Sequence, residues 1–126
     1  MNGSFSLIFL ILIACGSPKE KVSEPVLLNS EKFAEVIQNE PEILLIDVRT
    51  PQEYQNGFIE GAVNIDIRAE NFEGKIKHFD RETPVAVYCA KGGRSGEASK
   101  ILHDLGFKEV YDLEGGYTSW SENTPQ

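Results

Sequence analysis

The chain has 126 residues, and its 20 aspartates and glutamates outnumber its 12 lysines and arginines, which gives a formal net charge of −8. This acidic balance disfavours binding to nucleic acid or to an anionic membrane surface, but it does not exclude a small anionic substrate. The length is enough for one small domain with a single core.

A short apolar run stands near the N-terminus. Residues 5–14 are apolar over about half of the ~20 residues that a membrane-spanning helix needs, which is typical of a signal-peptide core. The run ends in Leu12-Ile13-Ala14-Cys15, which resembles a bacterial lipobox. We therefore expect residues 1–14 to be a signal peptide, Cys15 to carry a lipid, and the product to be an exported lipoprotein, periplasmic or anchored at the outer membrane. An ordinary cleaved signal followed by a chance cysteine is the alternative.

The next segment has the composition of a linker. Residues 15–25 lack apolar periodicity and are rich in proline, serine and charged side chains, which is typical of a flexible tether. Fully extended at about 3.3 Å per residue, this tether would hold a folded domain roughly 30 Å from the membrane surface. We place that domain at residues 26–123.

The domain begins with alternating strand and helix signals. Residues 25–28 are a strand candidate, and Asn29 or Ser30 can cap a helix that Pro41 ends. Residues 43–46 form a continuous apolar run, as expected for a strand that is covered on both faces in a parallel sheet.

Charged side chains follow this second strand. Asp47 and Arg49 stand at its carboxyl end, a position that lines ligand crevices in open parallel sheets but that also carries ion pairs holding loops. We favour a structural ion pair of Arg49 with Asp47 or with Glu53. Residues 50–53 have the pattern of a capping box, which predicts a short helix and gives Glu53 a structural role.

The later elements continue the alternation. The patterns predict a strand at residues 63–66, a helix carrying Phe72, Ile76 and Phe79, a strand at residues 109–113, and a last helix anchored by Tyr117 and Trp120 after a glycine break. His78 and His103 lie on predicted helices without cysteines or carboxylates at ligand spacing, so we expect no metal site. The order of elements predicts an α/β three-layer sandwich, with a central parallel sheet flanked by helices and the functional loop at the carboxyl edge of the strands.

The most informative segment joins a strand to a helix through Cys89. The apolar run at residues 85–88 ends on this cysteine, and Gly92 and Gly93 can both adopt positive φ, so that several backbone N–H groups can turn toward the sulfur. A buried core cysteine is the alternative, but a core cysteine needs neither the glycines nor nearby cations.

A helix with one apolar stripe is predicted to begin near Ser95 or Gly96. Its N-terminus carries about half a positive charge, and Lys91 and Arg94 add two whole charges, so the thiolate form of Cys89 should be favoured. Arg94 can either brace the loop through backbone carbonyls or contact an anionic donor. The segment therefore predicts an activated nucleophile in an anion-binding loop.

Four motifs resemble the rhodanese family of sulfurtransferases. Residues 89–95 are similar to its active-site loop Cys-x-x-Gly-x-Arg-Ser, and residues 46–54, 57–65 and 113–120 are similar to three further family segments in the same order. Phe58 stands where the family usually has histidine, a departure that bears on local packing more than on the chemistry.

The resemblance implies a rhodanese-like fold and a ping-pong transfer of sulfane sulfur through a persulfide on Cys89, with no other cofactor. The substrate loop would comprise Ala90, Lys91, Gly92, Gly93, Arg94 and Ser95, supported by Asp47, Arg49 and Glu53. The expected partners are a small donor such as thiosulfate and a thiol or protein acceptor, and the protein is expected to be a monomer.

Two alternatives come from other functional classes. One is a lipid-tethered sulfur carrier or binding module with little turnover. The other is a cysteine phosphatase or arsenate reductase, but those families place five residues between cysteine and arginine, and this chain has the four residues 90–93. The shorter loop suits a sulfur atom better than a tetrahedral phosphate.

Overall fold

The computed structural model describes residues 3–4 and 22–124. Cys15 and, apart from residues 3–4 and 22–25, the predicted signal peptide and tether lie outside the described residues. Within the described part, no helix combines the length and the apolar character that a membrane crossing requires.

A five-stranded sheet, parallel throughout, forms the centre of the fold, with strand order β1-β5-β4-β2-β3. The strands are β1 (Val26–Leu28), β2 (Leu44–Asp47), β3 (Val63–Asn64), β4 (Val85–Tyr88) and β5 (Val110–Leu113). The helices are α1 (Ser30–Asn39), α2 (Pro51–Gln55), α3 (Phe72–Ile76), α4 (Gly93–Asp104) and α5 (Gly116–Asn123).

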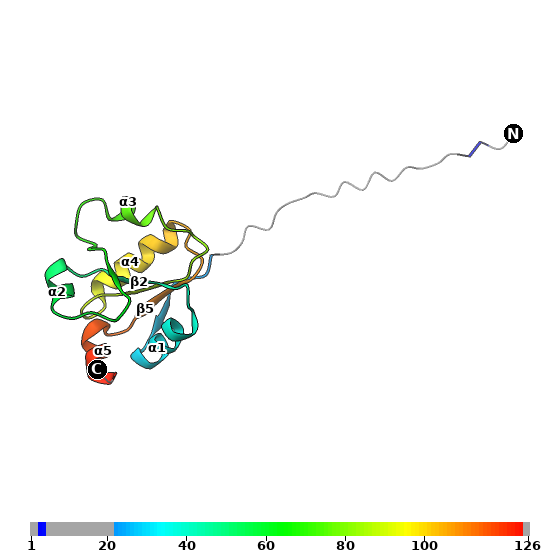
Figure 1. The fold of residues 1–126 in the computed structure, drawn as a ribbon. Helices are drawn as coiled ribbons and strands as arrows, with labels where there is room; N and C mark the ends of the chain where they lie inside the picture. The colour runs from blue at the N-terminus through cyan, green and yellow to red at the C-terminus, as the bar shows by residue number, and fades with distance from the viewer. Residues whose placement is uncertain (1–2, 5–21, 125–126) are drawn as a thin grey trace.

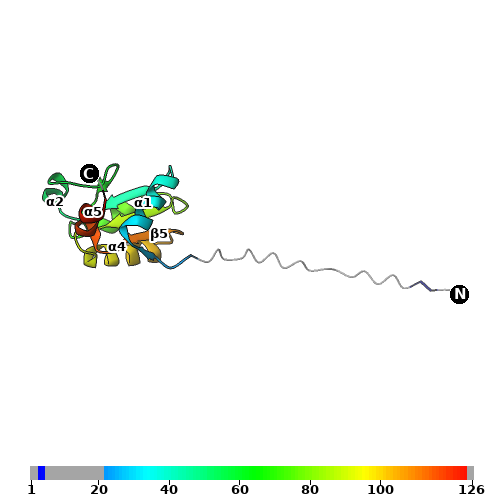
Figure 2. The same ribbon diagram turned by 90° about the horizontal axis from the view of Figure 1, so that it is seen from below.

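Helices cover both faces of this sheet. Figure 1 shows α3 and α4 on one side of the sheet and α1 and α5 on the other. The view from below in Figure 2 places α1 and α5 side by side. The predicted α/β three-layer sandwich is confirmed.

The central strand β4 shows why its sequence is continuously apolar. Val85 and Val87 belong to the core cluster that includes α3 and α4, whereas Ala86 and Tyr88 belong to the cluster with Phe33 of α1. All four β4 side chains are fully buried, because successive residues of a strand point to opposite faces and both faces are covered. Cys89 therefore follows a strand that is held rigidly on both sides.

The helix caps predicted at Asn29 and at residues 50–53 are confirmed. Asn29 accepts a hydrogen bond from the backbone N–H of Lys32 at 2.9 Å. Thr50 Oγ1 accepts from the N–H of Glu53, and the Glu53 carboxylate accepts from the N–H of Thr50, which completes the capping box of α2.

Two elements end at least two residues before their predicted ends. The strand expected at residues 63–66 ends at Asn64, and α3 ends at Ile76, so that His78 lies beyond this helix and not on it. Past the end of α3 the guanidinium of Arg81 donates hydrogen bonds to the carbonyls of Lys77 and Phe79. These carbonyls are satisfied by a side chain, and no further helical turn is needed to pair them.

Candidate active site

The loop after β4 turns into α4 at a single glycine. Gly92 is the N-cap residue of α4 with φ of +118°, whereas Gly93 is already helical and does not use its freedom to adopt positive φ. The N–H of Gly96 donates to the carbonyl of Gly92 at 3.0 Å. The helix thus begins two residues before the predicted start near Ser95, because one left-handed residue is enough to reverse the chain.

The sulfur of Cys89 lies inside this turn. The N–H of Gly92 donates to Cys89 Sγ at 3.0 Å, and Ser95 Oγ lies 3.5 Å from the same sulfur. Burial of the thiol opposes its ionisation, but hydrogen bonds from the Ser95 side chain and from the backbone of Ser95, Gly92 and Lys91 outweigh it and lower the pKa of Cys89. The direction agrees with the activated thiolate expected from the sequence.

The start of α5 holds the backbone of the cysteine in place. The N–H groups of Tyr117 and Thr118 donate to the carbonyls of Cys89 and Ala90 at 2.7 and 3.0 Å. This close approach requires glycine at position 116, where φ is +60° and a Cβ atom would lie 2.5 Å from the Cys89 carbonyl oxygen. The sequence indicated only a chain break here, and its glycine pair was the available signal.

Arg94 has a partner that the sequence analysis did not predict. Its Nη1 and Nη2 atoms donate to Glu53 Oε1 and Oε2 at 2.7 and 2.9 Å. The hydrogen bonds from Arg94 lower the pKa of Glu53 to about 2. Neither expected role of Arg94 describes this arrangement, because its guanidinium fork binds the carboxylate of α2 and joins α2 to α4.

Asp47 and Arg49 form a buried ion pair. Of the two partners predicted for Arg49, Asp47 and Glu53, the structure therefore has Asp47. Arg49 Nε lies 3.0 and 3.1 Å from the two Asp47 carboxylate oxygens, and Nη2 lies 2.7 Å from one of them. The guanidinium also donates to the carbonyl of Gly57 at 2.7 Å and lies 4.5 Å from the centre of the Tyr117 ring. Neither Asp47 nor Arg49 lines the pocket of Cys89.

An open pocket of about 480 Å³ lies in front of the cysteine. It is lined by Arg68, Cys89, Ala90, Lys91, Gly93, Arg94 and Glu97. Lys91 and Arg68 are exposed, and neither forms an ion pair with a residue that the structure describes. Arg68 comes from the loop after β3 and carried no recognisable signal in the sequence.

Outside this pocket, the structure shows the surroundings of Phe58 and the spacing of the side chains that could bind a metal ion. Phe58 is 45% exposed and stacks on Tyr54 with ring centres 4.2 Å apart, so its replacement of the family's usual histidine affects surface packing and not the wall around the sulfur. Over residues 3–4 and 22–124, no three histidine, cysteine or carboxylate side chains are grouped closely enough to hold a metal ion.

Comparison with known proteins points to one family. Residues 30–123 match the family model of the rhodanese-like domain. The chain is 35% identical over 80 residues to thiosulfate sulfurtransferase GlpE of Shewanella oneidensis, covering 64% of this chain and 77% of that protein. It is 35% identical over 88 residues to thiosulfate sulfurtransferase 16, chloroplastic, of Arabidopsis thaliana, covering 62% and 73%.

Solved structures agree with these matches. A crystal structure of a rhodanese-related protein from Thermoplasma volcanium superposes with a TM-score of 0.68 at 35% identity, covering 79% of this chain and 95% of that chain. An NAD-dependent persulfide reductase from A. fulgidus matches with a TM-score of 0.53 at 35% identity, covering 63% of this chain and 14% of that chain.

Proposed function

The chain belongs to the family of rhodanese-like domains, and we propose that it moves sulfane sulfur from a donor such as thiosulfate to a thiophilic acceptor through a persulfide on Cys89. The observation that carries the proposal is the position of the sulfur. Cys89 Sγ accepts the Gly92 N–H at 3.0 Å and lies at the base of an open pocket. Cys89 is 1% exposed, but a lowered thiol pKa and a pocket that leads to the cysteine are what a sulfur nucleophile needs.

The first half of the reaction loads the cysteine. The Cys89 thiolate attacks the outer sulfur of thiosulfate, and the S–S bond of the donor breaks with its electron pair leaving on sulfite. The new S–S bond leaves a persulfide anion on Cys89. The pocket of about 480 Å³ gives the added sulfur room, and the N–H of Gly92, which donates to Cys89 Sγ, stabilises negative charge on the sulfur pair.

The second half returns the enzyme to its starting state. A nucleophilic acceptor, either cyanide in an assay or a thiol of a small molecule or protein, attacks the outer sulfur of the persulfide. The S–S bond breaks with its electron pair on Cys89, which becomes a thiolate again. Because both half-reactions pass through the same sulfur, the scheme is ping-pong and needs no further cofactor.

Recognition of an anionic donor falls to Lys91 and Arg68. Arg94 lines the pocket, but its charge is offset by the two hydrogen bonds to Glu53. Lys91 and Arg68 line the same pocket, are exposed and form no ion pair with described residues, so they are available to attract a thiosulfate anion.

Intact-mass measurement of the full chain tests the proposal. Incubation with thiosulfate should add the mass of one sulfur atom, and cyanide should then remove it with formation of thiocyanate. The chain has two cysteines, so Cys15→Ser should still load and Cys89→Ser should not. Loading that survives in Cys89→Ser, or a loaded protein that cyanide cannot discharge, would refute the transfer mechanism and favour a binding module.

The cellular location is a separate proposal. We propose that Cys15 carries a lipid and that the domain acts at a membrane surface outside the cytoplasm, on the basis of the Leu12-Ile13-Ala14-Cys15 pattern after a short apolar run.

A further inference from the structure

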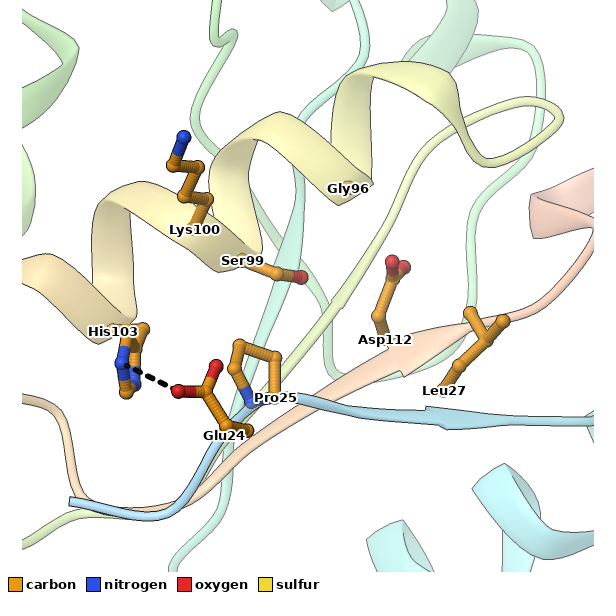
Figure 3. Close-up of a pocket in the computed structure, with 8 residues that line it drawn as sticks. All are labelled: Glu24, Pro25, Leu27, Gly96, Ser99, Lys100, His103 and Asp112. Carbon is orange, nitrogen blue, oxygen red and sulfur yellow. Dashed lines mark ion pairs between the residues drawn. The ribbon is translucent and has the colours of Figure 1, made fainter. Parts of the chain in front are cut away.

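A second pocket lies on another face of α4, away from the cysteine. It has a volume of about 270 Å³ and is a partly open hollow between α4, the chain that leads into β1, and Asp112 of β5 (Figure 3). None of the residues that line it also lines the pocket of Cys89. Any ligand of this second pocket would therefore be bound separately from the sulfur donor.

Unpaired acceptor atoms are concentrated in this pocket. Among the described residues, three buried side-chain polar atoms lack a hydrogen-bond partner, and two of them, Asp112 Oδ1 and His103 Nδ1, belong to its lining. Asp112 is only 7% exposed, and Figure 3 shows its carboxylate directed into the space beneath α4. Leaving a buried charged acceptor unpaired is unfavourable, so a ligand that donates to it has a clear advantage.

Neighbouring side chains meet this demand only in part: a hydrogen bond from the Ser95 side chain opposes the rise that burial causes in the pKa of Asp112, but Oδ1 itself has no partner. The hydroxyl of Ser99, which lines the pocket, donates to the carbonyl of Ser95 at 2.8 Å. Figure 3 shows the ammonium group of Lys100 pointing away from Asp112. Across from the carboxylate stands Gly96, where an added Cβ atom would lie 4.0 Å from Asp112 Oδ2, so the lack of a side chain leaves this space open.

The second unpaired atom is Nδ1 of His103, whose other ring nitrogen faces Glu24. His103 Nε2 lies 3.4 Å from Glu24 Oε1. When the imidazole is neutral and its proton is on Nε2, the nitrogen that faces Glu24, Nδ1 is an acceptor. The pocket then offers acceptors from Asp112 and His103 and a second carboxylate at its rim.

The other residues that line the pocket favour a cationic ligand with an apolar part. Pro25 and Leu27 form an apolar side, and Leu27 is 59% exposed. Two carboxylates repel anions, and a formal net charge of −8 attracts cations to the whole molecule. An organic cation with a short apolar chain satisfies the acceptors and the apolar wall together, and charge-assisted N–H···O bonds to a carboxylate are among the stronger hydrogen bonds in proteins.

We propose that this pocket binds a small aliphatic ammonium ion, with the ammonium group on the Asp112 carboxylate and the alkyl chain against Pro25 and Leu27.

Titration of the ¹⁵N-labelled full chain with n-butylamine hydrochloride tests this binding at about pH 7.5, where an alkylamine is protonated. Burial raises the pKa of Asp112 to about 6, so its carboxylate is mainly ionised at that pH. We expect saturable shifts of the backbone amide signals of Gly96, Ser99 and Asp112. The uncharged n-pentanol, of similar size, should produce no saturable shift.

Two variants test whether the Asp112 carboxylate binds the ammonium group. Asp112→Asn keeps the shape of the side chain and should weaken n-butylamine binding at least about tenfold, the equivalent of about 1.4 kcal/mol. Glu114→Gln removes an exposed carboxylate two residues away and should leave the affinity within about twofold. A thermal melt confirms that each variant is folded.

The proposal is overturned if n-butylamine gives no saturable shift, if n-pentanol binds as well, or if folded Asp112→Asn retains the affinity of the wild type. Because amide signals report binding directly, these outcomes do not depend on whether Cys89 transfers sulfur.

Discussion

Replacing Ser95 by alanine should raise the pKa of Cys89 and slow its alkylation at neutral pH. Ser95 is fully buried, its Oγ lies 3.5 Å from Cys89 Sγ, and its side chain is the leading cause that lowers the pKa of this thiol against the effect of burial. Alanine removes the hydroxyl and adds nothing to replace it. The thiolate then keeps only the backbone hydrogen bonds of the loop.

The size of the effect follows from the geometry. A hydrogen bond to a charged group contributes about 1.5–3 kcal/mol, and one pKa unit corresponds to about 1.4 kcal/mol, which gives an increase of about one to two units. The contact at 3.5 Å is long, and the same hydroxyl lies 3.1 Å from the carbonyl oxygen of Gly92, which competes for its single proton. We therefore expect the lower end, about one unit.

The assay is the rate of iodoacetamide alkylation against pH, in a Cys15→Ser background where Cys89 is the sole thiol. Ser99→Ala is the matched control, because Ser99 lies one turn further along α4, is also buried, and donates to the Ser95 carbonyl and not to the sulfur. If Ser95→Ala leaves the inflection unchanged, or if Ser99→Ala moves it equally far, the side-chain hydrogen bond is not what activates Cys89.

Three further predictions concern other positions. Lys91→Glu should lower kcat/KM for thiosulfate at least about fivefold more than for a neutral persulfide donor, whereas Lys77→Glu, an equal charge change outside the pocket, should affect both donors alike. Burial raises the pKa of Asp112 to about 6, above its unfolded value, so this group's contribution to stability is present below about pH 4 and lost as the pH rises through about 6. Asp112→Asn should therefore raise the free energy of unfolding at pH 8 by up to about 3 kcal/mol, and with it the melting temperature, but should raise neither at pH 4. Equal melting temperatures of the variant and the wild type at pH 8 would contradict this. Cys15→Ala should abolish detergent partitioning of the expressed protein, and equal partitioning would exclude a lipid at this residue.

Local patterns in the sequence predicted the elements that carry the site. The apolar run at residues 85–88 predicted β4, and Thr50 with Glu53 predicted the cap of α2, because each signal lies within a few neighbouring residues. The position of Cys89 at the carboxyl end of a buried parallel strand followed from these signals alone.

Contacts between distant segments could not be predicted in this way. Glu53 and Arg94 are separated by 41 positions, and each has a sufficient local explanation, one as a capping residue and one as a loop cation. Gly116 carries a turn signal, but only the packed structure reveals that its missing side chain makes room for the Cys89 carbonyl oxygen. The start of α4 was misplaced because either glycine of the Gly92-Gly93 pair could have been the left-handed residue.

Because Arg94 is paired with Glu53, one kind of group stabilises the thiolate and another kind attracts the anionic donor. The sulfur, which is itself buried, is stabilised by the N–H of Gly92, a dipole fixed in a part-buried turn at a distance of 3.0 Å, which salt in the solvent screens less than it screens an exposed side chain. Lys91 and Arg68 stand exposed at the pocket, so their attraction for an anionic donor falls as the ionic strength rises. The reactivity of the thiolate and the capture of the donor are therefore controlled by separate parts of the structure, and the salt concentration can change the second while leaving the first largely as it is.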